Sequence, residues 1–177
     1  SDPKLGIVGP LSNAASWQNV PTLFAQDQSF AINPLPESVT AQDMAAAVRA
    51  ASEQTYPRSS FLNGFCFMIR RAVINAIGYM DEAAFPVGYG EENDFCIRAQ
   101  DAGFALAIAD DVYVYHAKSK SFGTAQRVSL SERGTETLRQ KQGGEKFDAL
   151  LARAAQTERM DKVRRNIEMA IKANNLE

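Results

Sequence analysis

Short apolar runs alternate with short helical patterns through the middle of this sequence, and this alternation restricts the fold more than any other feature. The runs at 65–69, 104–108 and 112–115 are predicted strands, and the stretches 71–77 and 91–102 are predicted helices. Gly78 and Gly103 follow these helices, where a left-handed closing residue is common. Asp110 and Asp111 are assigned to a turn between the last two strands. The run at 104–108 is apolar on both faces, as a central strand requires, so we assign the chain to the α/β class.

The segment before this region reads as a short strand followed by a long loop. Residues 5–8 form an apolar run that Gly9-Pro10 is expected to end. Residues 11–39 are rich in turn formers and are assigned to a surface loop or lid. A chain that begins almost directly on a buried strand suggests that further sequence precedes Ser1.

A helix is predicted over residues 41–54. Thr40 is placed as its N-cap, with Asp43 as the acidic partner of a capping box. The apolar residues of the segment fall on one helical stripe.

From Thr124 the sequence is helical in period, rich in charge and poor in aromatic residues. Gly143-Gly144 interrupts it. Residues 158–172 mix basic and acidic groups too evenly for a membrane anchor and favour a helix that packs on a neighbouring domain. We expect one domain over 1–143 and a helical extension, or a linker to a further domain, over 144–177.

Composition excludes several functional classes. The 19 Lys and Arg nearly balance the 21 Asp and Glu, so the sequence lacks the basic field that holds a nucleic-acid backbone. Its apolar runs are too short to span a membrane. The two cysteines, Cys66 and Cys96, are too few for a disulfide scaffold. We therefore expect a reduced cytoplasmic chain, with the inner face of the membrane as the alternative location.

The acidic cluster Gly90-Glu91-Glu92-Asn93-Asp94 is the first candidate site. Carboxylates are stabilised at helix N-termini, so Glu91 and Asp94 are equally consistent with a solvated face, and Asp94 with an ion pair to Arg98. Glu92 shares a helical face with Cys96, which aims it toward the packed side or a cleft beside it. A half-buried carboxylate is costly unless it is paired or used, so Glu92 is the candidate for catalysis.

His116, the only histidine, is the second candidate because it leaves the last predicted strand, and ligands bind at strand ends in open α/β sheets. A histidine at a strand end is more often structural or merely exposed, and no cluster of His or Cys supplies further metal ligands. Lys118 and Lys120, separated by small residues, form a basic loop suited to phosphate oxygens or simply to solvent. Asn63-Gly64 is a tight turn that lets another group approach the backbone closely.

Several catalytic signatures are missing from the sequence. It contains no nucleophile elbow, and a histidine-based triad would have to use His116. Its glycines have neither the spacing of a Walker loop nor that of a dinucleotide fingerprint.

Five ordered blocks together resemble the acceptor-side, C-terminal half of family 2 glycosyltransferases. The blocks are FLNGFCFMIRR (61–71), IGYMDE (77–82), GYGEENDFCIR (88–98), AGF (102–104) and VYH (114–116). The resemblance covers about 6–143. It implies a partial GT-A fold, with a mixed sheet flanked by helices and a helical C-terminal tail, together with inversion at the anomeric carbon.

The resemblance also implies roles for individual residues. Glu92 falls where relatives carry the catalytic base, with Glu91 before it and Asp94 as a further candidate. Asn63 and Gly64 fall near the donor or acceptor sugar. His116 matches a histidine that joins the site of a divalent metal, Mn²⁺ or Mg²⁺, in some members. Lys118 and Lys120 fall in a loop that can close over the diphosphate.

The family's upstream nucleotide-binding half, with its Asp-x-Asp metal motif, has no counterpart in these residues. We therefore expect a fragment of an enzyme that moves a sugar from a nucleotide-sugar donor to a saccharide acceptor in cell-surface polysaccharide or glycan synthesis, inactive without that half. Two alternatives stay open. One is a non-catalytic carbohydrate- or protein-interaction module, and the other is a degenerate transferase kept for assembly.

Overall fold

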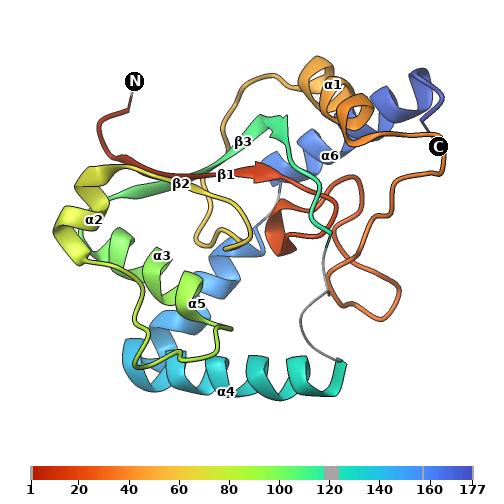
Figure 1. Ribbon diagram of the computed structural model, residues 1–177. Helices are drawn as coiled ribbons and strands as arrows, with labels where there is room; N and C mark the ends of the chain where they lie inside the picture. Colours follow the sequence, from red (N-terminus) through yellow and green to blue (C-terminus); the bar gives the residue numbers. More distant parts are fainter. Residues whose placement is uncertain (1, 118–123, 157, 177) are drawn as a thin grey trace.

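The sheet at the centre of the molecule has three strands in the order β2-β1-β3 (Figure 1). The structure is a computed structural model that describes residues 2–117, 124–156 and 158–176. The middle strand, β1 (Leu5–Leu11), runs antiparallel to β2 (Met68–Ile69) and parallel to β3 (Ala105–Tyr113). Ile7 pairs with Ile69 on one side and with Leu106 on the other. The predicted α/β class, with a mixed sheet flanked by helices, is confirmed.

Helices cover the sheet on both sides (Figure 1). They are α1 (Ala41–Ala51), α2 (Arg71–Ile77), α3 (Glu91–Asp101), α4 (Thr124–Gln142), α5 (Gly144–Ala154) and α6 (Glu158–Ala173), with a short 3₁₀ turn, η1 (Ser16–Gln18). Helix α1 packs on β3 and on α6, while α3 lies between β3 and α4. Many of the largest fully buried side chains come from the strands, from α3 and from the tail, among them Ile7, Ile108, Phe95, Leu138 and Ile167.

Strand β1 continues through Gly9 and Pro10 to Leu11, so the expected end at Gly9-Pro10 is wrong. Beyond Val8 the strand pairs only with β3, and a proline that cannot donate to a ladder is tolerated where one side of a strand is unpaired. The carbonyl of Pro10 accepts a hydrogen bond from Gln18 Nε2 at 2.6 Å.

The predicted buried strand at 65–69 is reduced to two residues at the sheet edge. Met68 is 78% exposed. Asn63 Oδ1 accepts a hydrogen bond from the backbone N–H of Phe65 at 3.1 Å, which bends the chain into a local turn instead of an extended strand.

The predicted turn at Asp110-Asp111 is also wrong, because β3 runs unbroken through both residues. Asp110 is fully buried. Its carboxylate accepts hydrogen bonds from the backbone N–H groups of Thr55 and Tyr56, both at 3.1 Å, and from the Thr55 hydroxyl. These bonds from the neighbouring loop satisfy a charge that the strand alone could not.

Three other local predictions, for the α1 capping box, for the glycines that follow α2 and α3, and for the long loop, agree with the structure. Thr40 and Asp43 form the predicted capping box, although α1 ends at Ala51 and Ser52 is already extended. Gly78 and Gly103 have positive φ, at 74° and 84°. Between β1 and α1 the only regular segment is η1, as expected of a long loop.

The tail helices pack on the rest of the chain. Helix α6 lies along α1 (Figure 1) and buries Met160, Val163, Ile167 and Ile171. Arg164, on the same side, donates from Nε to the carbonyl of Asn19 at 3.0 Å and from Nη2 to that of Trp17 at 2.8 Å. Helix α6 therefore fixes the start of the long loop.

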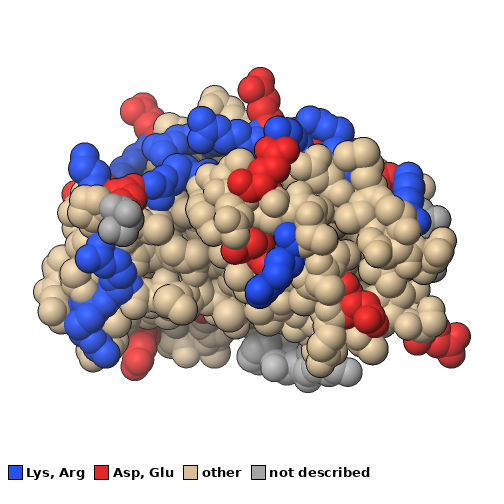
Figure 2. Space-filling view, turned by 90° about the horizontal axis from the view of Figure 1, so that it is seen from above, with Lys and Arg blue, Asp and Glu red and all other residues tan. Residues whose placement is uncertain are grey.

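The surface carries charges of both signs. Figure 2 shows Lys and Arg gathered along one edge of the upper face, with Asp and Glu among them. No helix in the described ranges is long and apolar enough to cross a membrane.

Candidate functional site

The turn at Asn63-Gly64-Phe65 brings the two main candidate elements together. The backbone N–H of Asn63 donates to Gln18 Oε1 at 2.7 Å, and Asn63 Nδ2 donates to Ser16 Oγ at 3.3 Å. These bonds fix the turn against η1. Gly64 faces α3 on one side of the turn, and the Phe65 ring faces His116 on the other.

Glu92 projects from the first turn of α3 against Gly64. A Cβ at Gly64 would lie 3.0 Å from the Cβ of Glu92 and 3.7 Å from its carboxyl carbon. The close approach predicted for the Asn63-Gly64 turn is therefore confirmed, and the approaching group is Glu92. The helical face predicted for Glu92 is confirmed as well, because Cys96 and Ala99 are fully buried.

The carboxyl group of Glu92 has little to stabilise its charge. One oxygen, Oε2, accepts a hydrogen bond from the backbone N–H of Gly90 at 3.3 Å. Burial raises the pKa of Glu92 above its ordinary value, and the neighbouring charge of Glu91 raises this pKa further. A carboxylate with a raised pKa is a better proton acceptor near neutral pH than an ordinary glutamate.

Glu91 lies beside Glu92 and leans toward Gly88. A Cβ at Gly88 would lie 3.5 Å from Glu91 Oε1. The other oxygen, Oε2, is buried and has no hydrogen-bond partner. Buried polar atoms are normally paired, so this oxygen of Glu91 has unused hydrogen-bonding capacity.

Asp94 points to the opposite side of α3, and it is fully buried rather than solvated. Its carboxylate contacts Arg98 Nε at 2.8 Å, Lys141 Nζ at 2.9 Å and Gln142 Nε2 at 2.6 Å. Burial alone would raise the pKa of Asp94, but these hydrogen bonds and the charge of Arg98 outweigh it and hold the pKa below its ordinary value. The predicted Asp94–Arg98 pair is present, and Asp94 does not join Glu91 and Glu92.

His116 is held in one orientation by three contacts. Its backbone N–H donates to Asn13 Oδ1 at 2.8 Å, and its ring stacks on Phe65 with centroids 4.7 Å apart. Nδ1 lies 2.7 Å from the carbonyl oxygen of Ala14. A carbonyl oxygen can only accept, so Nδ1 is the donor of this bond, and a metal-ligating histidine typically makes such a bond from the ring nitrogen that does not bind the metal.

The described residues do not complete a metal site. No group of three or more His, Cys, Asp or Glu side chains in the described ranges is placed to hold an ion, and Mn²⁺ and Mg²⁺ need several ligands. His116 therefore fits as one ligand at most, and the residues present do not fit a divalent ion by themselves. Lys118 and Lys120, the predicted phosphate-binding pair, lie outside the described residues.

A wide groove of about 870 Å³ lies near the acidic cluster. It is lined by the 27–32 part of the long loop, by Tyr89 and by one face of α4. Phe30 and Tyr89 offer aromatic surfaces, and Ser131 and Thr135 offer hydroxyl groups. This mixture suits a saccharide, which presents both apolar C–H faces and hydroxyl groups.

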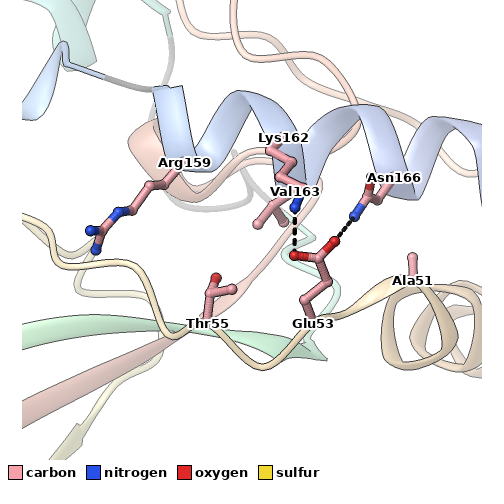
Figure 3. Close-up of a pocket in the computed structure, with 7 residues that line it drawn as sticks. All are labelled: Ala51, Glu53, Thr55, Arg159, Lys162, Val163 and Asn166. Carbon is pink, nitrogen blue, oxygen red and sulfur yellow. Dashed lines mark hydrogen bonds and ion pairs between the residues drawn. The ribbon is translucent and has the colours of Figure 1, made fainter.

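A smaller pocket of about 270 Å³ lies between the end of α1 and α6. Figure 3 shows Glu53 in this pocket, bound to Lys162 at 2.7 Å and to Asn166 at 3.4 Å. None of the lining residues belongs to the sequence-predicted site, so the pocket is separate from the Glu92 region.

Sequence reasoning missed the polar residues beneath the site. Gln18 is fully buried and joins the carbonyl of Pro10 to the N–H of Asn63. Asn13 links the long loop to the backbone of His116. Both lie in a loop without periodicity, where polar residues are unremarkable in the sequence, so no pattern could distinguish them.

Comparison with known proteins agrees with the resemblance seen in the sequence. No curated protein and no solved structure matches the chain. A sequence model of the family described as "Glycosyltransferase like family 2" matches residues 2–137, which contain β1 to β3, the Glu91–Glu92 pair and most of α4. The match covers well over half of the 177 residues. The chain therefore belongs to glycosyltransferase family 2.

Proposed function

We propose that this chain forms the acceptor side of an inverting glycosyltransferase, with Glu92 as the general base. The observation that carries the proposal is the Glu92 carboxyl group, which lies against Gly64, is largely withdrawn from water and accepts a backbone hydrogen bond from Gly90. Family membership gives glycosyl transfer as the class of reaction.

The proposed reaction is a single displacement. An acceptor hydroxyl oxygen attacks the anomeric carbon of a nucleotide sugar while its proton passes to Glu92. The bond from that carbon to the diphosphate oxygen breaks, and the nucleoside diphosphate leaves with the electron pair. Attack from the face opposite the leaving group inverts the anomeric configuration. A positioned general base contributes roughly 10²–10⁴-fold to such a step.

Other residues are assigned supporting roles in the proposal. Gly64 lacks a side chain and so lets Glu92 pack against the turn, and Asn63 holds this turn in place. We assign the acceptor to the groove beside Tyr89 and α4 because aromatic faces and hydroxyl groups meet there. His116 is assigned as one ligand of a divalent ion completed by groups outside the described residues, and Lys118 and Lys120 as contacts to the diphosphate.

The proposal includes a nucleotide-binding segment outside these 177 residues, because the sequence lacks the Asp-x-Asp motif that family members use there. It places the product in cell-surface polysaccharide or glycan synthesis, at the cytoplasmic side of the membrane. The isolated chain is expected to show no turnover.

Transfer assays with the full-length protein test the proposal. UDP-, GDP- and dTDP-hexoses are supplied with a panel of oligosaccharide acceptors, and nucleoside diphosphate release is measured together with the anomeric configuration of the product. With one class of donor, we expect one nucleoside diphosphate to be released for each sugar transferred. The product should have the anomeric configuration opposite to that of the donor. Retention of configuration would contradict the mechanism.

The competing function is a carbohydrate-binding module without chemistry, which the aromatic groove also favours. It predicts that free oligosaccharides bind while no donor is cleaved. Tyr113 of β3 is buried, so its ring is not available as a contact surface for such a module.

A further inference from the structure

Helix α4 contacts the segment that leads into α3, residues 81–90, at two separate points. A buried stripe of α4, formed by Leu130, Gly134 and Leu138, faces the body of the molecule. At one point Gly134 meets the backbone of Tyr89 and Gly90. At the other point, Lys141 forms ion pairs with Asp81 and Asp94. Gln142 donates a hydrogen bond to Asp94 as well. The loop before α3 and the first turn of α3 are thus held between the two contacts.

The contact at Gly134 is backbone against backbone. A Cβ at this position would lie 1.6 Å from the carbonyl oxygen of Tyr89, 2.8 Å from its carbonyl carbon and 3.6 Å from the nitrogen of Gly90. The nearest atoms belong to the backbone, so no side chain can rotate away to make room. Glycine at 134 is therefore required for α4 to lie this close to the loop.

Lys141 makes the second contact through charge. Its Nζ lies 2.7 Å from Asp81 Oδ2 and 2.9 Å from Asp94 Oδ1. Gln142 adds a hydrogen bond to Asp94 at 2.6 Å. Along the chain, Asp81 precedes and Asp94 follows the Tyr89-Gly90 segment, so Lys141 ties both of its flanks to α4.

The segment pressed against Gly134 is the one that holds Glu92. Tyr89 and Gly90 both have positive φ, at 66° and 131°, a conformation that is costly for a tyrosine and persists only where its surroundings enforce it. The N–H of Gly90, one residue beyond the carbonyl that touches Gly134, donates to Glu92 Oε2 at 3.3 Å. A displacement of this peptide moves the donor that orients the carboxylate.

We infer that Gly134 is a positioning residue, which sets the place of the Tyr89-Gly90 peptide and through it the orientation of the Glu92 carboxylate. The inference rests on the proposed function of Glu92. It also gives α4 a part in the site, where the sequence offered only a helical tail.

The test compares Gly134→Ala with Gly144→Ala, a glycine-to-alanine change at the first residue of the next helix, α5. At Gly144 the nearest atom to an added Cβ is the end of the flexible Arg139 side chain, at 3.4 Å. Helix propensity alone predicts that both changes stabilise the chain, because alanine favours helices over glycine. The close contact predicts instead that Gly134→Ala lowers Tm while Gly144→Ala does not.

A second readout in this chain follows the Glu92 carboxyl by ¹³C NMR during an acid–base titration. Glu91, on the same helix, is the charged neighbour that raises the Glu92 pKa, and Gly64, packed against the Glu92 stem, brings no charge. The Gly90 N–H lowers the Glu92 pKa, so we expect Gly134→Ala, which displaces this donor, to move the Glu92 midpoint further above its ordinary value and Gly144→Ala to leave it unchanged. An unchanged midpoint together with a raised Tm in Gly134→Ala would overturn the inference.

If Gly134→Ala does not fold, Lys141→Met tests the other contact with the same titration, and an unmoved Glu92 midpoint in a folded Lys141→Met chain then overturns the inference. In the full-length protein, folded Gly134→Ala should lose about 10- to 100-fold in kcat with little change in the acceptor KM, as expected for a misplaced catalytic group. Normal kcat in folded Gly134→Ala would also overturn it. Normal turnover in Glu92→Gln would instead refute the proposed base and leave the NMR result on Gly134 standing.

Discussion

The two sides of α3 place a carboxylate in opposite environments and shift its pKa in opposite directions. On the side that faces α4, Asp94 is surrounded by Arg98, Lys141 and Gln142, and its pKa is lowered. On the side that faces the Asn63-Gly64 turn, Glu92 has backbone donors but no cationic partner, its neighbour Glu91 is acidic, and its pKa is raised. The charge of Asp94 stabilises the packing of α3 against α4, whereas Glu92 has the environment expected of a proton acceptor.

The largest expected change in the free energy of unfolding comes from removing Asp94, the carboxylate that is paired on the α4 side of α3. Asp94→Ala leaves Arg98 and Lys141 without their shared buried partner, and loss of one member of such a network costs roughly 3–5 kcal/mol. Urea unfolding of this chain measures the change. A loss below about 1 kcal/mol would mean that the ion pairs of Asp94 contribute no more than exposed pairs do.

Asp110 extends the comparison to a second satisfied carboxylate. Asp110→Asn retains the shape but places an amide where three hydrogen bonds are accepted, which should cost about 1–3 kcal/mol. Asp111→Asn, a change at the neighbouring and more exposed carboxylate, is the control and should have little effect. Equal effects at both positions would contradict the account of β3.

The pH dependence of stability should have opposite signs on the two sides of α3. The lowered pKa of Asp94 contributes stability that is present above its unfolded-state pKa and is lost as pH falls through its folded pKa. The raised pKa of Glu92 means that the folded state holds its proton more tightly, so stability falls as pH rises from the ordinary glutamate value through the folded one.

The matching variants separate these two contributions. Glu92→Gln should raise Tm near neutral pH, and the gain should shrink on acidification. The deficit of Asp94→Asn should also be largest near neutral pH and shrink in acid. Thermal unfolding across the acid range measures both, and a stability deficit in Glu92→Gln at neutral pH would contradict the assignment.

The smallest change in Tm is expected when a divalent metal ion is added. His116 offers one nitrogen, so about 1 mM MnCl₂ should change the Tm of this chain very little, since stabilisation requires a concentration well above Kd. His116→Ala should respond to MnCl₂ in the same way. Tight stoichiometric binding of Mn²⁺ by calorimetry would show that the described residues hold more ligands than the geometry indicates.

The parts that sequence predicted are those set by neighbours along the chain. The Thr40–Asp43 capping box and the face shared by Glu92 and Cys96 depend on residues three or four apart, and both are present. The resemblance to family 2 also located the Glu91–Glu92 block within the matched region.

The parts that sequence missed depend on distant partners. Asp110 looked like a turn residue because its partners, Thr55 and Tyr56, lie in a loop far along the chain. Asp94 looked solvated because Lys141 and Gln142 come from the tail. Nothing local marks Gly134, whose need for glycine arises only when α4 meets Tyr89.

The most direct test of the account is the kcat of Glu92→Gln in the full-length protein, measured together with its Tm. Glutamine keeps the size of the side chain and removes the proton acceptor. We predict that kcat falls by at least ~10²-fold, as expected when a general base is lost, while Tm stays the same or rises. Near-normal kcat in a folded Glu92→Gln protein would show that Glu92 is not the base.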